Sequence, residues 1–129
     1  MVVPTEHQEQ CALFEWATWM AKRMPELHLM HAIPNGGKRD IRTAARLKAE
    51  GVKPGVPDIF LPIPRGGKHG LYIELKRRRG GVISKAQEAW MRALMEQGYV
   101  CAVCKGAEAA KNEILMYLDL MEVDANVSV

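Results

Sequence analysis

Two apolar segments separated by a turn rich in Pro and Gly restrict the fold of this chain more than any other feature. Residues 58–62 (DIFLP) and residues 70–76 (GLYIELK) flank residues 64–69 (PRGGKH). Short apolar runs bounded by turn residues are typical of β-strands that pair as a hairpin. The chain is therefore expected to contain a sheet, built around this hairpin.

The sequence on either side of the hairpin has the spacing of helices and further strands. Thr5 and Gln8 form a capping-box signature for a first helix, which should end before Pro25. Further elements are expected as a strand over residues 27–33, a helix over 41–50, a helix after Ser84 that turns Ala86, Trp90, Leu94 and Met95 inward, a strand over 99–103 and a helix over 107–121. This order predicts an α/β fold with a central mixed β-sheet flanked by helices.

Length and composition indicate one ordinary domain over residues 1–129, with a frayed tail from about residue 123. Hydrophobic residues make up 48% of the chain, which is enough for a real core. No run of eighteen or more apolar residues indicates a membrane span, and the N-terminus lacks the pattern of a secretory signal. We therefore expect a cytoplasmic protein with no membrane contact.

Charge is distributed unevenly although the net charge is only +3. Basic residues gather in residues 38–48 and 76–79, and acidic residues gather toward the C-terminal end. A basic side set against an acidic side favours a phosphate-rich partner such as nucleic acid, although such clusters also occur on ordinary solvated surfaces.

Cys101 and Cys104 form a CxxC pair that allows a zinc or redox interpretation. They lie in a strand-like apolar run with no second CxxC and no nearby His pair, whereas structural zinc sites use four such ligands. We favour ordinary core cysteines.

The hairpin also carries the residues with the clearest chemistry. With a turn centred near Gly66, Asp58 and Glu74 stand eight residues on either side of the centre and face each other on neighbouring strands. Opposed side chains lie about 5 Å apart at Cβ, and like charges there repel. An oxygen-preferring cation such as Mg²⁺ would offset that repulsion. Strand alternation puts Lys76 on the same face as Glu74, which suits phosphodiester hydrolysis.

A surface salt-bridge ladder is the alternative explanation for a Glu-x-Lys pattern on a strand. The apolar setting of the strand, and Pro57 directly before Asp58, favour a site.

The pattern Val56-Pro57-Asp58, a hairpin, and Ile73-Glu74-Leu75-Lys76 resembles the PD-(D/E)xK motif of the restriction-endonuclease-like superfamily. The finer resemblance is to the stand-alone VRR-NUC nucleases of phages and bacteria, and it extends from Glu6 to about Leu118. The segments that carry it are residues 35–39 (NGGKR), 48–58 (KAEGVKPGVPD), 70–76 (GLYIELK), 84–87 (SKAQ) and 98–99 (GY).

The resemblance implies a metal-dependent DNA endonuclease with a restriction-endonuclease-like core. Asp58, Glu74 and the backbone carbonyl of Leu75 would hold Mg²⁺ or Mn²⁺, and Lys76 would be the catalytic lysine. Gln87 would also belong to the site, although it is equally explained as the capping-box partner of Ser84.

In this family an acid on the first helix often completes the site, as a metal ligand and catalytic residue. We favour Glu6 over Glu9, because Glu6 and Gln10 prolong the buried stripe of that helix. Both acids are also explained by the general preference of acidic residues for a helix N-terminus.

Expected DNA contacts come from a glycine-rich turn and from neighbouring cations, which approach phosphates closely. They are Asn35, Lys38, Arg39, Lys48, Lys53 and Arg77. The resemblance further implies a homodimer acting on branched DNA such as Holliday junctions, because cutting two strands requires two symmetry-related sites. Two alternatives remain: a DNA-binding module with little catalysis, and a sequence-specific restriction-type endonuclease. The tryptophans are expected in the core, although a pair on the first helix would also suit a dimer interface, and no role is assigned to the histidines.

Overall fold

The computed structural model describes residues 2–34 and 40–122, and its centre is a four-stranded sheet. The strands are β1 (His31–Ala32), β2 (Ile59–Leu61), β3 (Leu71–Lys76) and β4 (Val100–Lys105), in the order β1-β2-β3-β4. β1 and β3 both run antiparallel to β2, and β4 runs parallel to β3. The sheet is therefore mixed, as the sequence predicts.

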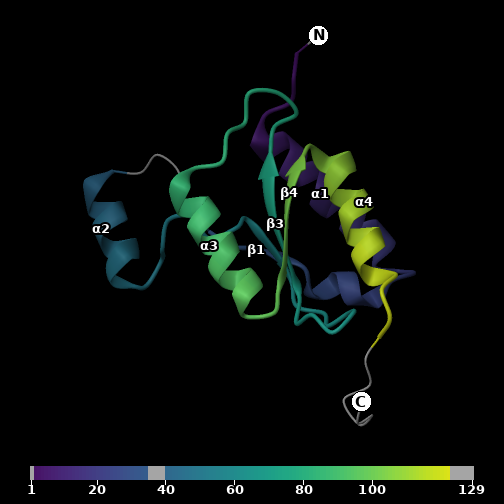
Figure 1. Ribbon diagram of the computed structural model, residues 1–129. Coiled ribbons are helices and arrows are strands. Elements are labelled where there is room, and N and C mark those ends of the chain that lie inside the picture. The colour runs from purple at the N-terminus through teal and green to yellow at the C-terminus, as the bar shows by residue number, and fades with distance from the viewer. Residues whose placement is uncertain (1, 35–39, 123–129) are drawn as a thin grey trace.

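Helices cover both faces of this sheet. α1 (Glu6–Met20) and α4 (Ala107–Leu118) lie on one side of β3 and β4, and α3 (Lys85–Glu96) lies on the other. α2 (Ile41–Ala49) stands beyond α3, away from the strands (Figure 1). The α/β class with a restriction-endonuclease-like core of sheet and flanking helices is confirmed.

The hydrophobic core fills the space between the sheet, α1 and α4. Leu71, Ile73 and Leu75 alternate along β3 and are almost wholly buried, and Leu13 of α1 and Ile114 of α4 pack in the same cluster. Because side chains alternate along a strand, Glu74 and Lys76 point to the opposite face, toward α3. One strand thus separates the core from the polar residues of the site.

Two helices begin at the capping boxes that the sequence predicts. Thr5 Oγ1 accepts a hydrogen bond from the Gln8 backbone amide, and Gln8 Oε1 accepts one from the Thr5 backbone amide. Ser84 and Gln87 repeat this arrangement at α3. Such caps satisfy amides that have no partner inside the helix, so they fix where the helix starts.

Several sequence predictions are wrong in detail. Residues 27–33 do not form one strand, because Pro25 opens a 3₁₀ helix (Pro25–Leu29) and only His31 and Ala32 pair with β2. The C-terminal helix ends at Leu118 rather than near residue 121.

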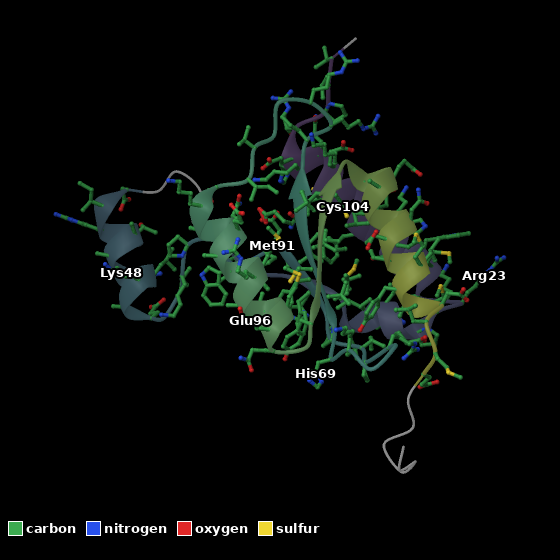
Figure 2. The ribbon with its side chains drawn as sticks, in the orientation of Figure 1. Arg23, Lys48, His69, Met91, Glu96 and Cys104 are labelled. Atoms are coloured by element: carbon green, nitrogen blue, oxygen red, sulfur yellow. The ribbon has the colours of Figure 1, made fainter. Side chains whose placement is uncertain are left out.

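The buried face of α3 also differs from the prediction. Met91 points toward the sheet and is buried (Figure 2), whereas Ala86 is exposed and Met95 is 50% exposed. Trp19 is exposed rather than in the core. The expected tail from about residue 123 lies outside the described residues. No helix in the described part of the chain has the length and apolar character needed to cross a membrane.

Candidate active site

Asp58 and Glu74 lie opposite each other at the end of the hairpin. Ile59 pairs with Ile73 in the β2–β3 register, so the next pair outward is Asp58 with Glu74, as the sequence predicts. Asp58 Oδ2 accepts a hydrogen bond of 2.9 Å from the Leu75 amide. Asp58 therefore holds the end of β3 in place while its carboxylate stands beside Glu74.

Lys76 and Gln87 complete a buried polar cluster around Glu74. Lys76 Nζ lies 3.5 Å from Glu74 Oε1 and donates to Gln87 Oε1 at 3.2 Å, and Gln87 Nε2 donates to the same Glu74 oxygen. Glu74 is 2% exposed and Lys76 is 7% exposed. Burial of both charges is not what a surface salt-bridge ladder would show, because such ladders remain solvated.

Gln87 is both the capping-box residue of α3 and a hydrogen-bond partner of Lys76 and Glu74. Its Oε1 accepts from the Ser84 amide at 2.9 Å, as a capping-box residue should, and it also receives the bond from Lys76. The cap fixes the side chain at the first turn of α3, so its amide group is held against Glu74.

The environment of Glu74 opposes its ionisation. Burial and the neighbouring Asp58 carboxylate raise the pKa of Glu74 to about 8, although Lys76 acts in the opposite direction. Within the described residues, Glu74 Oε2 is a buried oxygen with no hydrogen-bond partner. A buried polar atom without a partner is costly, so this oxygen is suited to an additional ligand.

The chemistry of these donors fits Mg²⁺ or Mn²⁺. In the described part of the chain, no three His, Cys, Asp or Glu side chains are assembled to hold a metal by themselves. A cation at Asp58 and Glu74 would thus have two carboxylate ligands and take the remainder from backbone, water or substrate. This ligand set is typical of Mg²⁺, which usually keeps several waters.

A cavity of about 540 Å³ lies between Asp58 and the start of α1. Asp58 and Leu75 line it from the sheet, and α1 contributes residues that share the side facing the site: Glu6, His7, Gln10, Cys11 and Phe14. Glu6 is exposed, so the predicted reason for choosing it, a continued buried stripe, is wrong. Glu6 nevertheless lines the same cavity as Asp58.

Glu9 takes a different place from Glu6. It is 2% exposed, and its carboxylate accepts from Arg78 Nε at 2.9 Å and from the Ala107 amide at 3.4 Å. Glu9 therefore joins α1 to the chain after β3 and to the first residue of α4. The sequence alone does not identify Arg78 as the partner of Glu9, because Arg78 is one of three consecutive arginines.

The predicted DNA contacts are only partly covered by the structure. Lys48, labelled on α2 in Figure 2, is exposed, as are Lys53 and Arg77. Asn35, Lys38 and Arg39 lie outside the described residues. Their exposure leaves Lys48, Lys53 and Arg77 accessible to phosphates, but α2 stands beyond α3, away from β3, the strand that carries Glu74 (Figure 1).

Cys101 and Cys104 behave as packing residues. Cys104 is buried and Cys101 half-buried, and burial raises the pKa of each thiol to about 11. A thiol with a raised pKa is a poor nucleophile and metal ligand, in agreement with the interpretation as core residues.

An α/β core that brings two opposed carboxylates and a lysine together at the end of a hairpin defines the class of restriction-endonuclease-like folds. The model of one nuclease family within this class, the VRR-NUC domain, matches residues 3–108. A solved structure described as a VRR-NUC domain protein is 30% identical, with 95% of each chain covered and a TM-score of 0.79. The chain belongs to the VRR-NUC family. The search of curated proteins gave no match.

Proposed function

We propose that this protein is a divalent-metal-dependent DNA endonuclease that hydrolyses phosphodiester bonds, with a preference for branched DNA such as Holliday junctions. The observation that carries the proposal is the cluster of Asp58, Glu74, Lys76 and Gln87, in which Glu74 and Lys76 are buried and one glutamate oxygen has no partner among the described residues. Burying Glu74 and Lys76 costs stability, and a cluster of this kind is typical of a functional site.

The residues that would hold Mg²⁺ or Mn²⁺ are Asp58, Glu74 and the backbone carbonyl of Leu75, with Glu6 reaching across the cavity. When bound, the cation would supply charge neutralisation and activation of water at the scissile phosphate. This assignment is supported by Glu74 Oε2, which has no partner in the described part of the chain, and by the repulsion from Asp58.

Lys76 and Gln87 would act on the reacting groups themselves. The Lys76 ammonium is held by Glu74 and Gln87, so it has a fixed position from which to stabilise negative charge on the phosphate. The Gln87 amide, fixed by the helix cap, would orient the attacking water or the phosphate beside it.

Binding of DNA would rest on shape and phosphate contacts rather than on base sequence. Lys48, Lys53 and Arg77 support this through their exposure, and Asn35, Lys38 and Arg39 are proposed with them from sequence. Two copies related by a two-fold axis would place two active sites on the two strands of a junction. Affinity should then fall steeply with salt.

The direct test is incubation of the purified protein with a four-way junction, linear duplex and supercoiled plasmid, with Mg²⁺, Mn²⁺ or EDTA. Cleavage by wild type should require the metal, and Asp58→Ala and Lys76→Ala should each lower the rate roughly 100- to 1,000-fold. The control is Glu88→Gln, an exposed residue of α3 whose side chain is 65% exposed. Cleavage that survives Asp58→Ala or Lys76→Ala would refute the site.

The same experiment separates the alternatives. Tight DNA binding without cutting under any metal would identify a binding module that retains the fold. Discrete fragments from linear duplex would identify a sequence-specific restriction-type enzyme. Size-exclusion chromatography with light scattering measures whether the active species is a dimer.

A further inference from the structure

A second hollow is lined by the loop that leads into Asp58. It has a volume of about 400 Å³. Its walls are mainly apolar, from Ile33, Val52, Val56 and Trp90, and Glu50 and Lys53 add two charged side chains. Trp90 of α3 is half-buried, and it is not part of the hydrophobic core cluster. The inward position of this turn is taken by Met91, which leaves the indole ring at the surface hollow.

This hollow is fixed close to the catalytic cluster by covalent and packing constraints. Val56 is two residues before Asp58, and Trp90 is three residues after Gln87, which is less than one helical turn. Gly55, at φ +93°, lets the loop approach the Ala86 backbone so closely that a Cβ at Gly55 would lie 2.7 Å from it. The loop and α3 therefore hold Trp90 at a set distance from Asp58 and Gln87.

We propose that this hollow binds one unpaired nucleobase of the DNA, next to the phosphodiester bond that is cut. The proposal rests on the proposed function and names the feature of the substrate that the enzyme reads. The base would stack on the Trp90 indole between the valine side chains, and the exposed Lys53 ammonium would contact the adjoining phosphate.

The composition of the hollow matches a nucleobase better than a purely apolar ligand. A base has two apolar faces and a polar edge, so it needs a flat aromatic wall together with donors and acceptors. Trp90 provides the wall, Glu50 provides an acceptor, and Lys53 provides donors and positive charge. Stacking on an aromatic ring tolerates any base, so such a site selects DNA structure rather than sequence.

Structure selectivity follows from this arrangement. A base in an intact duplex must be unstacked and unpaired before it can enter the hollow, whereas a base at a branch point is already released or weakly held. The penalty for entering is therefore lowest on branched DNA. The hollow would in this way give a preference for branched DNA over intact duplex.

The test uses 2-aminopurine, a fluorescent base whose emission changes on stacking, placed beside the cleavage site of a four-way junction. The protein carries Lys76→Ala to prevent cutting, and a second change, Trp90→Leu or Trp90→Phe, removes or reduces the aromatic wall. Met95→Ala is the control, since Met95 is exposed on the same helix, α3, and lines neither hollow. Circular dichroism verifies that each variant is folded.

The Lys76→Ala protein should quench the probe in the junction but not the same probe in paired duplex. Trp90→Leu should abolish the quenching and weaken junction binding roughly 5- to 150-fold, with duplex binding unchanged. Trp90→Phe should retain part of both effects, and Met95→Ala should leave both intact. The inference is overturned if the Lys76→Ala protein binds the junction tightly but the fluorescence of the probe does not change at any position around the cut. This result decides the question even if Trp90 variants cannot be made.

That outcome leaves the proposed function standing, since the wild-type protein would still bind and cut the junction. Absence of metal-dependent binding and cleavage by wild type refutes the proposed function, and the nucleobase site with it.

Discussion

Replacing Glu74 with Gln should change how the stability of the metal-free protein depends on pH. The substitution keeps the size of the side chain and an acceptor for Gln87 Nε2, but it removes the ionisable group. Burial and the Asp58 carboxylate raise the pKa of Glu74 from 4.5 to about 8. Between these two values the folded chain holds the Glu74 proton more strongly than the unfolded chain does. The free energy of unfolding therefore falls as pH rises through this range.

The magnitude follows from the shift. Each pKa unit corresponds to about 1.4 kcal/mol, so the full range gives an upper bound of about 5 kcal/mol. Below pH 4.5 both the folded and the unfolded chain hold the Glu74 proton, and the stabilisation from the raised pKa is fully retained. Above about pH 8 this stabilisation is fully lost. Between about pH 5.5 and about pH 7.5 the loss should approach about 3 kcal/mol.

Urea denaturation in EDTA at these two pH values measures the effect. The wild-type protein should lose about 3 kcal/mol more than Glu74→Gln between them, because titration of other groups, such as the four histidines, is common to both proteins. Glu88→Gln, on the exposed side of α3, should follow wild type. Equal pH dependence in wild type and Glu74→Gln would refute the argument that the buried carboxylate is destabilising.

Three further predictions concern the elements that support the site. Arg78→Ala leaves the buried Glu9 carboxylate with only the Ala107 amide as a donor among the described residues, and should lower the free energy of unfolding by about 2 kcal/mol. This loss is smaller than is usual for breaking a buried ion pair because Arg78 is 55% exposed, and Arg78→Lys should recover part of it. Ser84→Ala removes the side-chain cap of α3 and should cost about 1 kcal/mol; if it lowers cleavage only in proportion to the unfolded fraction, the cap does not position Gln87. Leu13→Ala opens a space in the core beneath β3 and should cost about 2 to 5 kcal/mol; a loss below 1 kcal/mol would contradict the position of Leu13 in the core.

The geometry of Asp58, Glu74 and Lys76 could be predicted because it depends on short-range rules. Hairpin register follows from the position of the turn, and strand alternation then decides which residues share a face. A turn centred near Gly66 is sufficient to place Asp58 opposite Glu74, and the observed register agrees. The same applies to Gln87, whose position three residues after Ser84 determines its contact with the helix cap.

Properties that depend on packing between distant segments could not be predicted in the same way. Helical spacing gives Glu6 and Glu9 similar claims to the site, and only the docking of α1 against Arg78 and Ala107 distinguishes them. Likewise, periodicity favours Trp90 as a core residue. Its exposure to a hollow follows from the path of residues 51–57, which no local pattern determines.

The two sides of the site are held in place by different kinds of contact. Asp58, Glu74, Lys76 and Gln87 are held by the hairpin and by one helix cap, so their mutual geometry should survive small movements of the rest of the fold. The α1 side of the cavity is placed instead by contacts between distant segments, among them the Glu9–Arg78 ion pair after β3 and the bond from the Ala107 amide of α4 to Glu9. Loosening that ion pair should therefore weaken any contribution of Glu6 to metal binding, while leaving the contacts among the other four residues intact.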